Sequence, residues 1–278
     1  MRRISNRLKR GIVLFLVSPI IVIGILIGCS ERNHETEGLE GLPVPVEGRS
    51  ITVSAASSLK DAMNAIQAAY VKHNPELNII INMGSSGQLQ QQIEQGAPVD
   101  IFISAAQRQM NALADKGFIV TDSRVNLVRN EIVVIAHKDA NMVTSFEDLA
   151  SPQVRFIGIG NPESVPAGSY AKEALETMEL WDSLKDKLVH TLNVRQVLSY
   201  IELGNADAGI VYHSDALLSE RIKVVAVAPE TSHSPILYPA ALIQSSRNNQ
   251  HASQFLEFLQ SDEAKEIFQQ YGFQTVNE

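Results

Sequence analysis

Cysteine and basic residues are scarce in this 278-residue chain, which holds one cysteine and 23 lysine and arginine residues against 31 acidic residues. A single cysteine cannot form an internal disulfide. The formal net charge of −8 argues against a nucleic acid partner, because phosphate backbones are bound by basic surfaces. The same charge gives no long-range attraction for an anion, so any affinity for one must come from local dipoles.

Patterns for metal binding and nucleophilic catalysis are also missing. No cluster of histidine, cysteine and aspartate has the spacing of metal ligands, so we expect no direct protein–metal ligands and no cofactor. No Gly-x-Ser-x-Gly elbow is present, and the seven histidines are scattered along the chain. A serine hydrolase needs a nucleophile, a base and an orienting group, so it is a weak alternative, and we expect no enzymatic activity.

One long apolar run stands at the N-terminus. Residues 1–10 carry five basic residues and no acid, and residues 12–27 are almost wholly apolar. This pattern predicts a signal peptide over residues 1–28, and Gly28 before Cys29 resembles a lipobox, the signal that bacteria cleave before a cysteine they lipidate. An uncleaved anchor helix is the alternative, but the run is short for a membrane span of about 20 residues.

Cleavage before Cys29 would give the only cysteine a role as lipid anchor. Residues 29–49 are polar and punctuated by glycine and proline, which is typical of a flexible tether. Loss of five basic residues leaves 18 against 31 acidic residues, a net charge of −13 with histidine neutral. We therefore expect a protein secreted across the cytoplasmic membrane and lipid-anchored at its outer face.

Apolar strands alternate with amphipathic helices along the rest of the chain, which favours an α/β fold with mostly parallel sheets flanked by helices. The expected strands are 51–55, 77–83, 100–104, 131–137, 156–160, 188–192, 208–212, 223–227 and 236–243. The expected helices are 59–73, 89–95, 107–116, 168–178, 195–203, 252–260 and 262–271. Gly117 follows the third helix as a C′ glycine would.

Two α/β lobes are plausible from this order of elements. The first lobe would comprise residues 50–132 with 237–278, and the second residues 133–236. The chain would leave the first lobe near residues 132–135 and return to it near 237–241. The length is compatible with this division.

Five short motifs place small neutral hydrogen-bond donors at strand ends or helix starts. The motifs are Ala55–Leu59, Gly84–Gln88, Val165–Tyr170, Asn193–Arg195 and Gly209–Tyr212. The first N–H groups of a helix have no internal partner, and with the helix dipole they favour an anion. If such ends met in one cleft between the lobes, they would enclose an oxyanion. A pocket without an acceptor favours a fully ionised oxyanion over hydrogen phosphate.

Structural roles for the same residues remain open at this point. Ser58 with Asp61 fits a capping box, and Ser86 fits a helix cap. Tyr212 fits a tyrosine buried in the core whose hydroxyl has a hydrogen-bond partner there. Arg195 is either an anion contact or a solvated arginine at a helix start.

The chain closely resembles the molybdate-binding subunits of ABC molybdate importers over nearly all of residues 50–273. The matching blocks are residues 51–63, 84–87, 92–105, 160–175, 209–216 and 267–273. The resemblance implies a two-lobed periplasmic-binding-protein fold of type II that closes on its ligand.

The resemblance also implies the ligand and its contacts. Ser58, Ser86 and Tyr212 would offer hydroxyl groups to molybdate, and Ala167 and Val194 would offer backbone N–H groups. The implied partners are molybdate or tungstate and an ABC permease, with the protein acting as a monomer. A related binding protein for sulfate or phosphate is the alternative. Molybdate and tungstate are not distinguished, because the two ions are nearly equal in size and charge.

Overall fold

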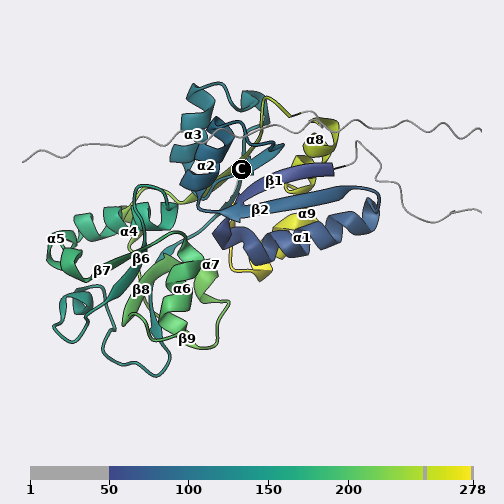
Figure 1. Ribbon diagram of the computed structural model, residues 1–278. Helices are drawn as coiled ribbons and strands as arrows, with labels where there is room; N and C mark the ends of the chain where they lie inside the picture. The colour runs from purple at the N-terminus through teal and green to yellow at the C-terminus, as the bar shows by residue number, and fades with distance from the viewer. Residues whose placement is uncertain (1–49, 247–248, 277–278) are drawn as a thin grey trace, which may run out of the picture. The chain divides into compact units, whose positions relative to one another are not determined.

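The computed structural model describes residues 50–246 and 249–276, which belong to one compact unit (Figure 1). The predicted signal peptide (residues 1–28), the tether (29–49) and the lipidation site Cys29 lie outside the described residues. In the described part of the chain, no helix is long and apolar enough to cross a membrane.

A six-stranded sheet has the order β11-β4-β10-β3-β1-β2. Its strands are β1 (Ser50–Ala56), β2 (Asn78–Gly84), β3 (Ile101–Ile103), β4 (Val125–Arg129), β10 (Leu237–Leu242) and β11 (Gln274–Thr275). Strand β1 is almost wholly buried, and it pairs in parallel with both β2 and β3. In Figure 1 the strands β1 and β2 lie with helices α1, α8 and α9 in the upper right part of the view.

A five-stranded sheet has the order β7-β6-β8-β5-β9. Its strands are β5 (Ile132–His137), β6 (Ile157–Gly160), β7 (Leu188–Thr191), β8 (Ala208–Tyr212) and β9 (Ile222–Val227). Figure 1 shows β6–β9 and helices α4–α7 gathered in the lower left part of the view. The chain passes between the sheets twice, after β4 and before β10.

Most strands of each sheet run in one direction, as predicted, and the exceptions β5, β10 and β11 make both sheets mixed. In the six-stranded sheet, β10 is antiparallel to β3 and β4, and β11 is antiparallel to β4. In the five-stranded sheet, β5 is antiparallel to β8 and β9. Strands joined by a crossover helix must run in parallel. Strands β5 and β10 each follow a passage between the sheets, and no crossover helix alone joins either to its neighbours in the sheet, so nothing forces them to be parallel to those neighbours.

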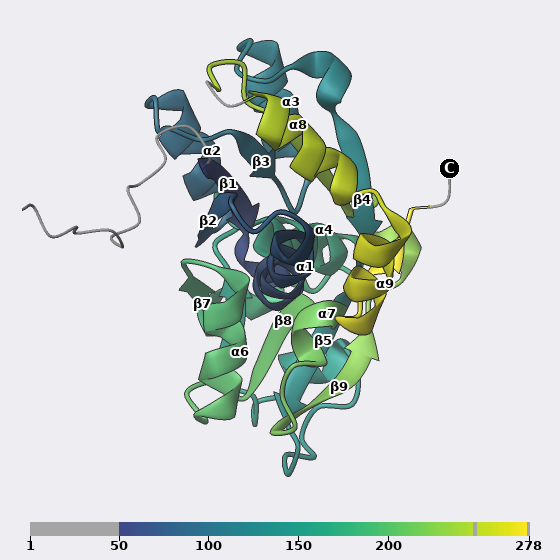
Figure 2. The ribbon, with the colours of Figure 1, turned by 90° about the vertical axis from the view of Figure 1, so that its right-hand side faces the viewer.

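Helices cover both sheets (Figures 1 and 2). Their bounds are α1 (Lys60–His73), α2 (Ser86–Glu94), α3 (Gln107–Asp115), α4 (Pro166–Thr177), α5 (Trp181–Leu184), α6 (Val194–Glu202), α7 (His213–Ala216), α8 (Asn249–Phe258) and α9 (Asp262–Gln270). Gly117 has a φ of +71° just past α3, as predicted for a C′ glycine. Strands β4 and β11 and the short helices α5 and α7 were not predicted.

Candidate functional site

All five predicted ligand residues line one small cavity of about 10 Å³. The remaining lining residues are Ala56, Ser57, Gly84, Ser85, Ala105, Val165 and Pro166. None of the lining residues carries a charged side chain. Elsewhere in the described ranges, 50–246 and 249–276, no three His, Cys, Asp or Glu side chains gather in a way that could hold a metal ion. The cavity therefore offers hydroxyl and N–H groups without a formal charge.

Two serines reach the cavity from the six-stranded sheet. Strands β1 and β2 are parallel neighbours whose last residues, Ala56 and Gly84, are paired in register. Ser58 lies in the single 3-10 turn after β1, and Ser86 is the first residue of α2 after β2. Because the carboxyl ends of parallel strands share one edge, both serines arrive at the same place, and both are buried.

Three residues reach the cavity from the five-stranded sheet. Ala167 is the second residue of α4, which follows β6, and Val194 is the first residue of α6, which follows β7. Tyr212 is the last residue of β8. Strand β6 is parallel to β7 and β8, so these three strands end at one edge. The first N–H groups of α4 and α6 lack a partner inside their helices, and both point toward the cavity end of the sheet.

The capping roles considered for the two serines are wrong. Helix α1 begins at Lys60 after Leu59, without a side-chain cap, and the Ser58 hydroxyl instead contacts the Tyr238 hydroxyl at 3.0 Å. Helix α2 is capped by Ser85, whose hydroxyl accepts a hydrogen bond from the Gln88 N–H at 3.3 Å. Tertiary contacts therefore leave both predicted serines in the cavity wall.

The hydroxyl groups of Ser86 and Tyr212 differ in what they can offer. The Ser86 oxygen accepts a hydrogen bond from the Ala105 N–H at 2.9 Å, so the Ser86 proton remains to be donated. The Tyr212 hydroxyl donates to the Ala105 carbonyl at 3.2 Å. Burial raises the pKa of Tyr212 well above its usual 10, so the phenol keeps its proton. To reach an anion, that proton must turn away from Ala105.

Hydrogen bonds between elements of the two sheets close the cavity. The Gly87 N–H at the start of α2 donates to the Ser164 carbonyl before α4, at 2.9 Å. The bond from Tyr212 to Ala105 also joins β8 to the segment that follows β3 of the six-stranded sheet. On the outside, the Arg108 guanidinium of α3 donates to the carbonyls of Pro162 and Glu163 at 3.2 and 3.1 Å.

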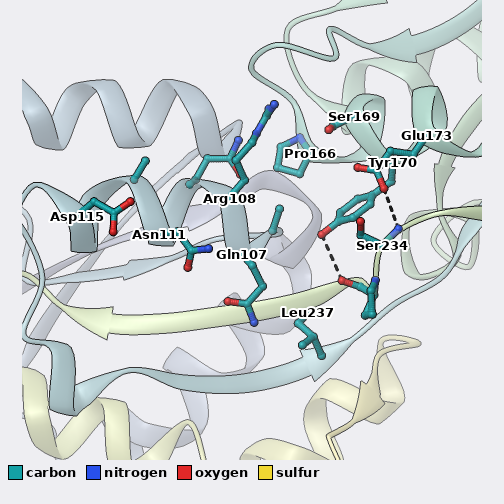
Figure 3. A pocket seen from close by; sticks show the side chains of 14 residues that line it. Gln107, Arg108, Asn111, Asp115, Pro166, Ser169, Tyr170, Glu173, Ser234 and Leu237 are labelled. Carbon is teal, nitrogen blue, oxygen red and sulfur yellow. Dashed lines mark hydrogen bonds between the residues drawn. The ribbon is translucent and has the colours of Figure 1, made fainter.

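A wider and more open depression lies next to the cavity, between α3 and α4 (Figure 3). Its lining includes two carboxylates, Asp115 of α3 and Glu173 of α4, against one guanidinium, Arg108. Figure 3 shows two bonds across it, from the Tyr170 hydroxyl to the Pro235 carbonyl and from the Ser234 N–H to Glu173, at 3.5 and 2.7 Å. Because carboxylates repel anions, the smaller neutral cavity is the better anion site.

Arg195 does not contact the cavity as a ligand, and it is not freely solvated. Its guanidinium forms ion pairs with Asp61 of α1 at 2.8 Å and with Asp215 of α7 at 2.7 Å. It also donates to the Ser58 carbonyl at 3.1 Å. Arg195 therefore ties the turn that carries Ser58 to α6, whose first residue is Val194.

Asp215 is a buried residue of this site that sequence reasoning missed. Its carboxylate is wholly inaccessible to solvent. Burial raises its pKa to about 6, although the positive charge of Arg195 acts in the opposite direction. The only sequence signal was an acid three residues after Tyr212, which is too common a pattern to identify a buried ion pair.

Replacing Asp215 by asparagine should change how stability depends on pH. Because the folded-state pKa is about 6 and the ordinary value 3.8, the folded protein binds more protons than the unfolded chain between pH 4 and 6. In the wild type this carboxyl therefore lowers stability as pH rises through that window, by roughly 3 kcal/mol in total, with no further change above pH 6. Urea unfolding of both proteins from pH 4 to 8 tests this, and exposed carboxylates cancel in the difference. Parallel pH profiles would contradict it.

The sequence matches the bacterial extracellular solute-binding protein family over residues 51–274. The molybdate-binding protein ModA of Escherichia coli is 41% identical over 232 residues, which cover 82% of this chain and 89% of that protein. A Bacillus subtilis protein provisionally named ABC transporter substrate-binding lipoprotein YvgL is 44% identical over 258 residues, 92% of this chain and 96% of that protein.

Solved structures have the same fold. A substrate-binding domain from Clostridium difficile, provisionally assigned to a molybdenum ABC transporter, is 45% identical with a TM-score of 0.65, covering 82% of this chain and 99% of its own. The periplasmic molybdate-binding protein of Azotobacter vinelandii is 24% identical with a TM-score of 0.75, covering 82% of this chain and all of its own. The predicted periplasmic-binding-protein fold is confirmed. The chain belongs to the bacterial extracellular solute-binding proteins, a family that binds solutes and does not catalyse reactions.

Proposed function

We propose that this protein captures molybdate or tungstate outside the cytoplasmic membrane and delivers it to an ABC permease. One observation carries the proposal: two serines, two helix starts and a tyrosine converge on one small cavity that no charged side chain lines. The ion would accept hydrogen bonds from the hydroxyls of Ser58, Ser86 and Tyr212. It would also accept them from the N–H groups of Ala167 and Val194.

The net negative charge of the chain does not oppose this function at short range. Helix dipoles and oriented N–H groups act within a few ångströms, where a low-dielectric wall strengthens them. The cavity lining has no carboxylate to accept a proton, so it suits an oxyanion that is fully ionised at neutral pH. Hydrogen phosphate carries a proton there and would leave it unpaired.

The relatives support molybdate over the other fully ionised candidate, sulfate. The Escherichia coli relative is named as a molybdate-binding protein. Molybdate and tungstate have longer bonds to oxygen than sulfate has, so a cavity shaped for them holds sulfate loosely. A sulfate-binding protein is the alternative, and a competition titration separates the two.

The location proposed for the mature protein is the outer face of the cytoplasmic membrane. Cleavage of residues 1–28 would leave Cys29 as the lipidated first residue, and residues 29–49 would tether a monomeric binding domain. The Bacillus subtilis relative carries the word lipoprotein in its name, which supports this proposal. Mass spectrometry of the N-terminal peptide from membranes tests it, and an unmodified Cys29 would overturn it.

Calorimetric titration with molybdate, tungstate, sulfate and phosphate tests the proposed ligand. We expect tight binding of the first two ions and much weaker binding of the others. Ser86→Ala should weaken molybdate binding roughly tenfold to a hundredfold, because a hydrogen bond to a charged group is lost. Ser261→Ala is the matched control, because Ser261 only caps α9 and does not line the cavity.

Two results would contradict the proposed function. Displacement of molybdate by sulfate at comparable concentration would make the protein a general sulfate-type binder. An unchanged affinity in Ser86→Ala would mean that the ion does not bind in this cavity. Ser261→Ala should keep the wild-type affinity and lose only about 1 kcal/mol of stability through the missing cap.

A further inference from the structure

A buried chain of hydrogen bonds lies behind Ser58, on the side away from the cavity. The Ser58 hydroxyl lies 3.0 Å from the Tyr238 hydroxyl, where either oxygen could be the donor. The Asn130 side-chain nitrogen donates to the Tyr238 oxygen at 3.2 Å and to the Ser214 hydroxyl at 2.8 Å. We call Asn130, Tyr238 and Ser58 the donor chain. Asn130 directly follows β4, and Tyr238 lies in β10, so both flank passages between the sheets.

The orientation of the Asn130 amide is fixed by backbone groups. Its oxygen accepts hydrogen bonds from the N–H groups of Glu131 at 2.9 Å and Ser214 at 3.4 Å. A backbone N–H can only donate, so the amide oxygen must face these two groups and the amide nitrogen must face Tyr238. Asn130 therefore donates a hydrogen bond to the Tyr238 oxygen and cannot accept one from it.

Tyr238 has one proton to donate. The Tyr212 hydroxyl also lies nearby, but of the two groups hydrogen-bonded to the Tyr238 oxygen, Ser58 and Asn130, only Ser58 can accept it. The side chain is fully buried, and burial raises its pKa well above the usual 10, so the phenol stays neutral. Since Asn130 already donates to this oxygen, the Tyr238 proton can be donated to the Ser58 oxygen. The Ser58 oxygen then accepts, and its own proton is free for the cavity. Ser86 reaches the same state through the Ala105 N–H.

We propose that Asn130 and Tyr238 are positioning residues that hold Ser58 as a hydrogen-bond donor and thereby select an oxyanion without a proton. The proposal rests on the proposed function and adds to it two residues that do not line the cavity. A serine that could rotate freely would accept the proton of hydrogen phosphate. A serine that accepts from Tyr238 on the far side turns its own proton into the cavity, so hydrogen phosphate meets a donor there and its proton stays unpaired.

A double-mutant cycle tests whether Tyr238 acts through Ser58. Tyr238→Phe should weaken molybdate binding about threefold to tenfold, the effect of one neutral hydrogen bond. In a Ser58→Ala background the same change should have no further effect, because the group that Tyr238 positions is gone. Tyr70→Phe is the matched control, because Tyr70 is a buried tyrosine of α1 that does not line the cavity.

Ion selectivity is the readout that a merely structural role would not move. In Tyr238→Phe the ratio of molybdate affinity to phosphate affinity should fall, because Ser58 regains the freedom to accept a proton. Tyr70→Phe should keep the wild-type ratio. Additive losses in the cycle, or an unchanged ratio in folded Tyr238→Phe, would overturn the donor chain.

A neutron structure of the deuterated wild type provides a test that needs no variant. The deuteron bonded to the Tyr238 oxygen should point to the Ser58 oxygen. A deuteron bonded to the Ser58 oxygen and pointing to Tyr238 would overturn the proposal. This result is independent of affinity. A wild type that binds no oxyanion would therefore defeat the proposed function, whereas a reversed deuteron would defeat the donor chain alone.

Discussion

Arg195→Met should lower the free energy of unfolding by about 3–5 kcal/mol, the usual effect of leaving a buried charge without its partner. Asp215 is wholly buried, and Arg195 is its ion-pair partner at 2.7 Å. The same change removes the bond to the Ser58 carbonyl and the ion pair to Asp61. Molybdate affinity should therefore fall as well. Urea unfolding and calorimetric titration measure the two effects.

Two further variants show whether the unpaired carboxylate is the cause. Arg155→Met is the matched control, because Arg155 is exposed and its guanidinium lies over Phe156, a contact worth roughly 0.5–1 kcal/mol at an exposed site. Adding Asp215→Asn to Arg195→Met removes the orphaned charge and should recover much of the stability. The explanation fails if the double variant is no more stable than Arg195→Met alone.

Gly168→Ala is the second change with a large expected effect. Helix α4 packs so closely on β6 that a Cβ at Gly168 would lie 2.5 Å from the carbonyl carbon of Gly160. Both partners are backbone, so no side chain can move aside. We expect a loss of about 3 kcal/mol or more, at the upper end of the range for overpacked sites. The shift of α4 would also displace the Ala167 N–H and weaken oxyanion binding.

Gly158→Ala, on the facing strand β6, is a graded control. A Cβ there would meet the Val197 side chain at 3.1 Å, and this neighbour can shift by a few tenths of an ångström. Gly158→Ala should lower the free energy of unfolding clearly less than Gly168→Ala does, as measured by thermal or urea unfolding. Equal losses in the two variants would show that the backbone contact with Gly160 is not the cause.

The strand ends and helix starts of the site could be predicted from the sequence because they are local features. Ser86 and Val194 each follow an apolar strand and open a helix, and the structure brings both to one cavity. The alternative capping box at Ser58 and Asp61 does not form because distant residues engage both side chains: Tyr238 contacts Ser58 and Arg195 pairs with Asp61. Local propensity cannot foresee a partner from another part of the chain.

Strand direction and buried polar contacts were beyond the reach of sequence patterns. Alternation of apolar residues predicts a strand but not the direction of its neighbour. The antiparallel directions of β5 and β10 were therefore not predicted. Tyr238 was predicted only to lie within the strand 236–243. Its contact with Ser58 spans 180 residues of chain and depends on the return of β10 to the first sheet.

The division of the cavity wall between two sheets has a consequence for unloading. Ser58 and Ser86 follow strands of one sheet, whereas Ala167, Val194 and Tyr212 follow or end strands of the other. If the two halves move apart, each takes its own donors with it and neither keeps a full coordination sphere. On the proposed function, a permease that pulls the halves apart would empty the protein by geometry alone, with no proton transfer and no covalent bond broken.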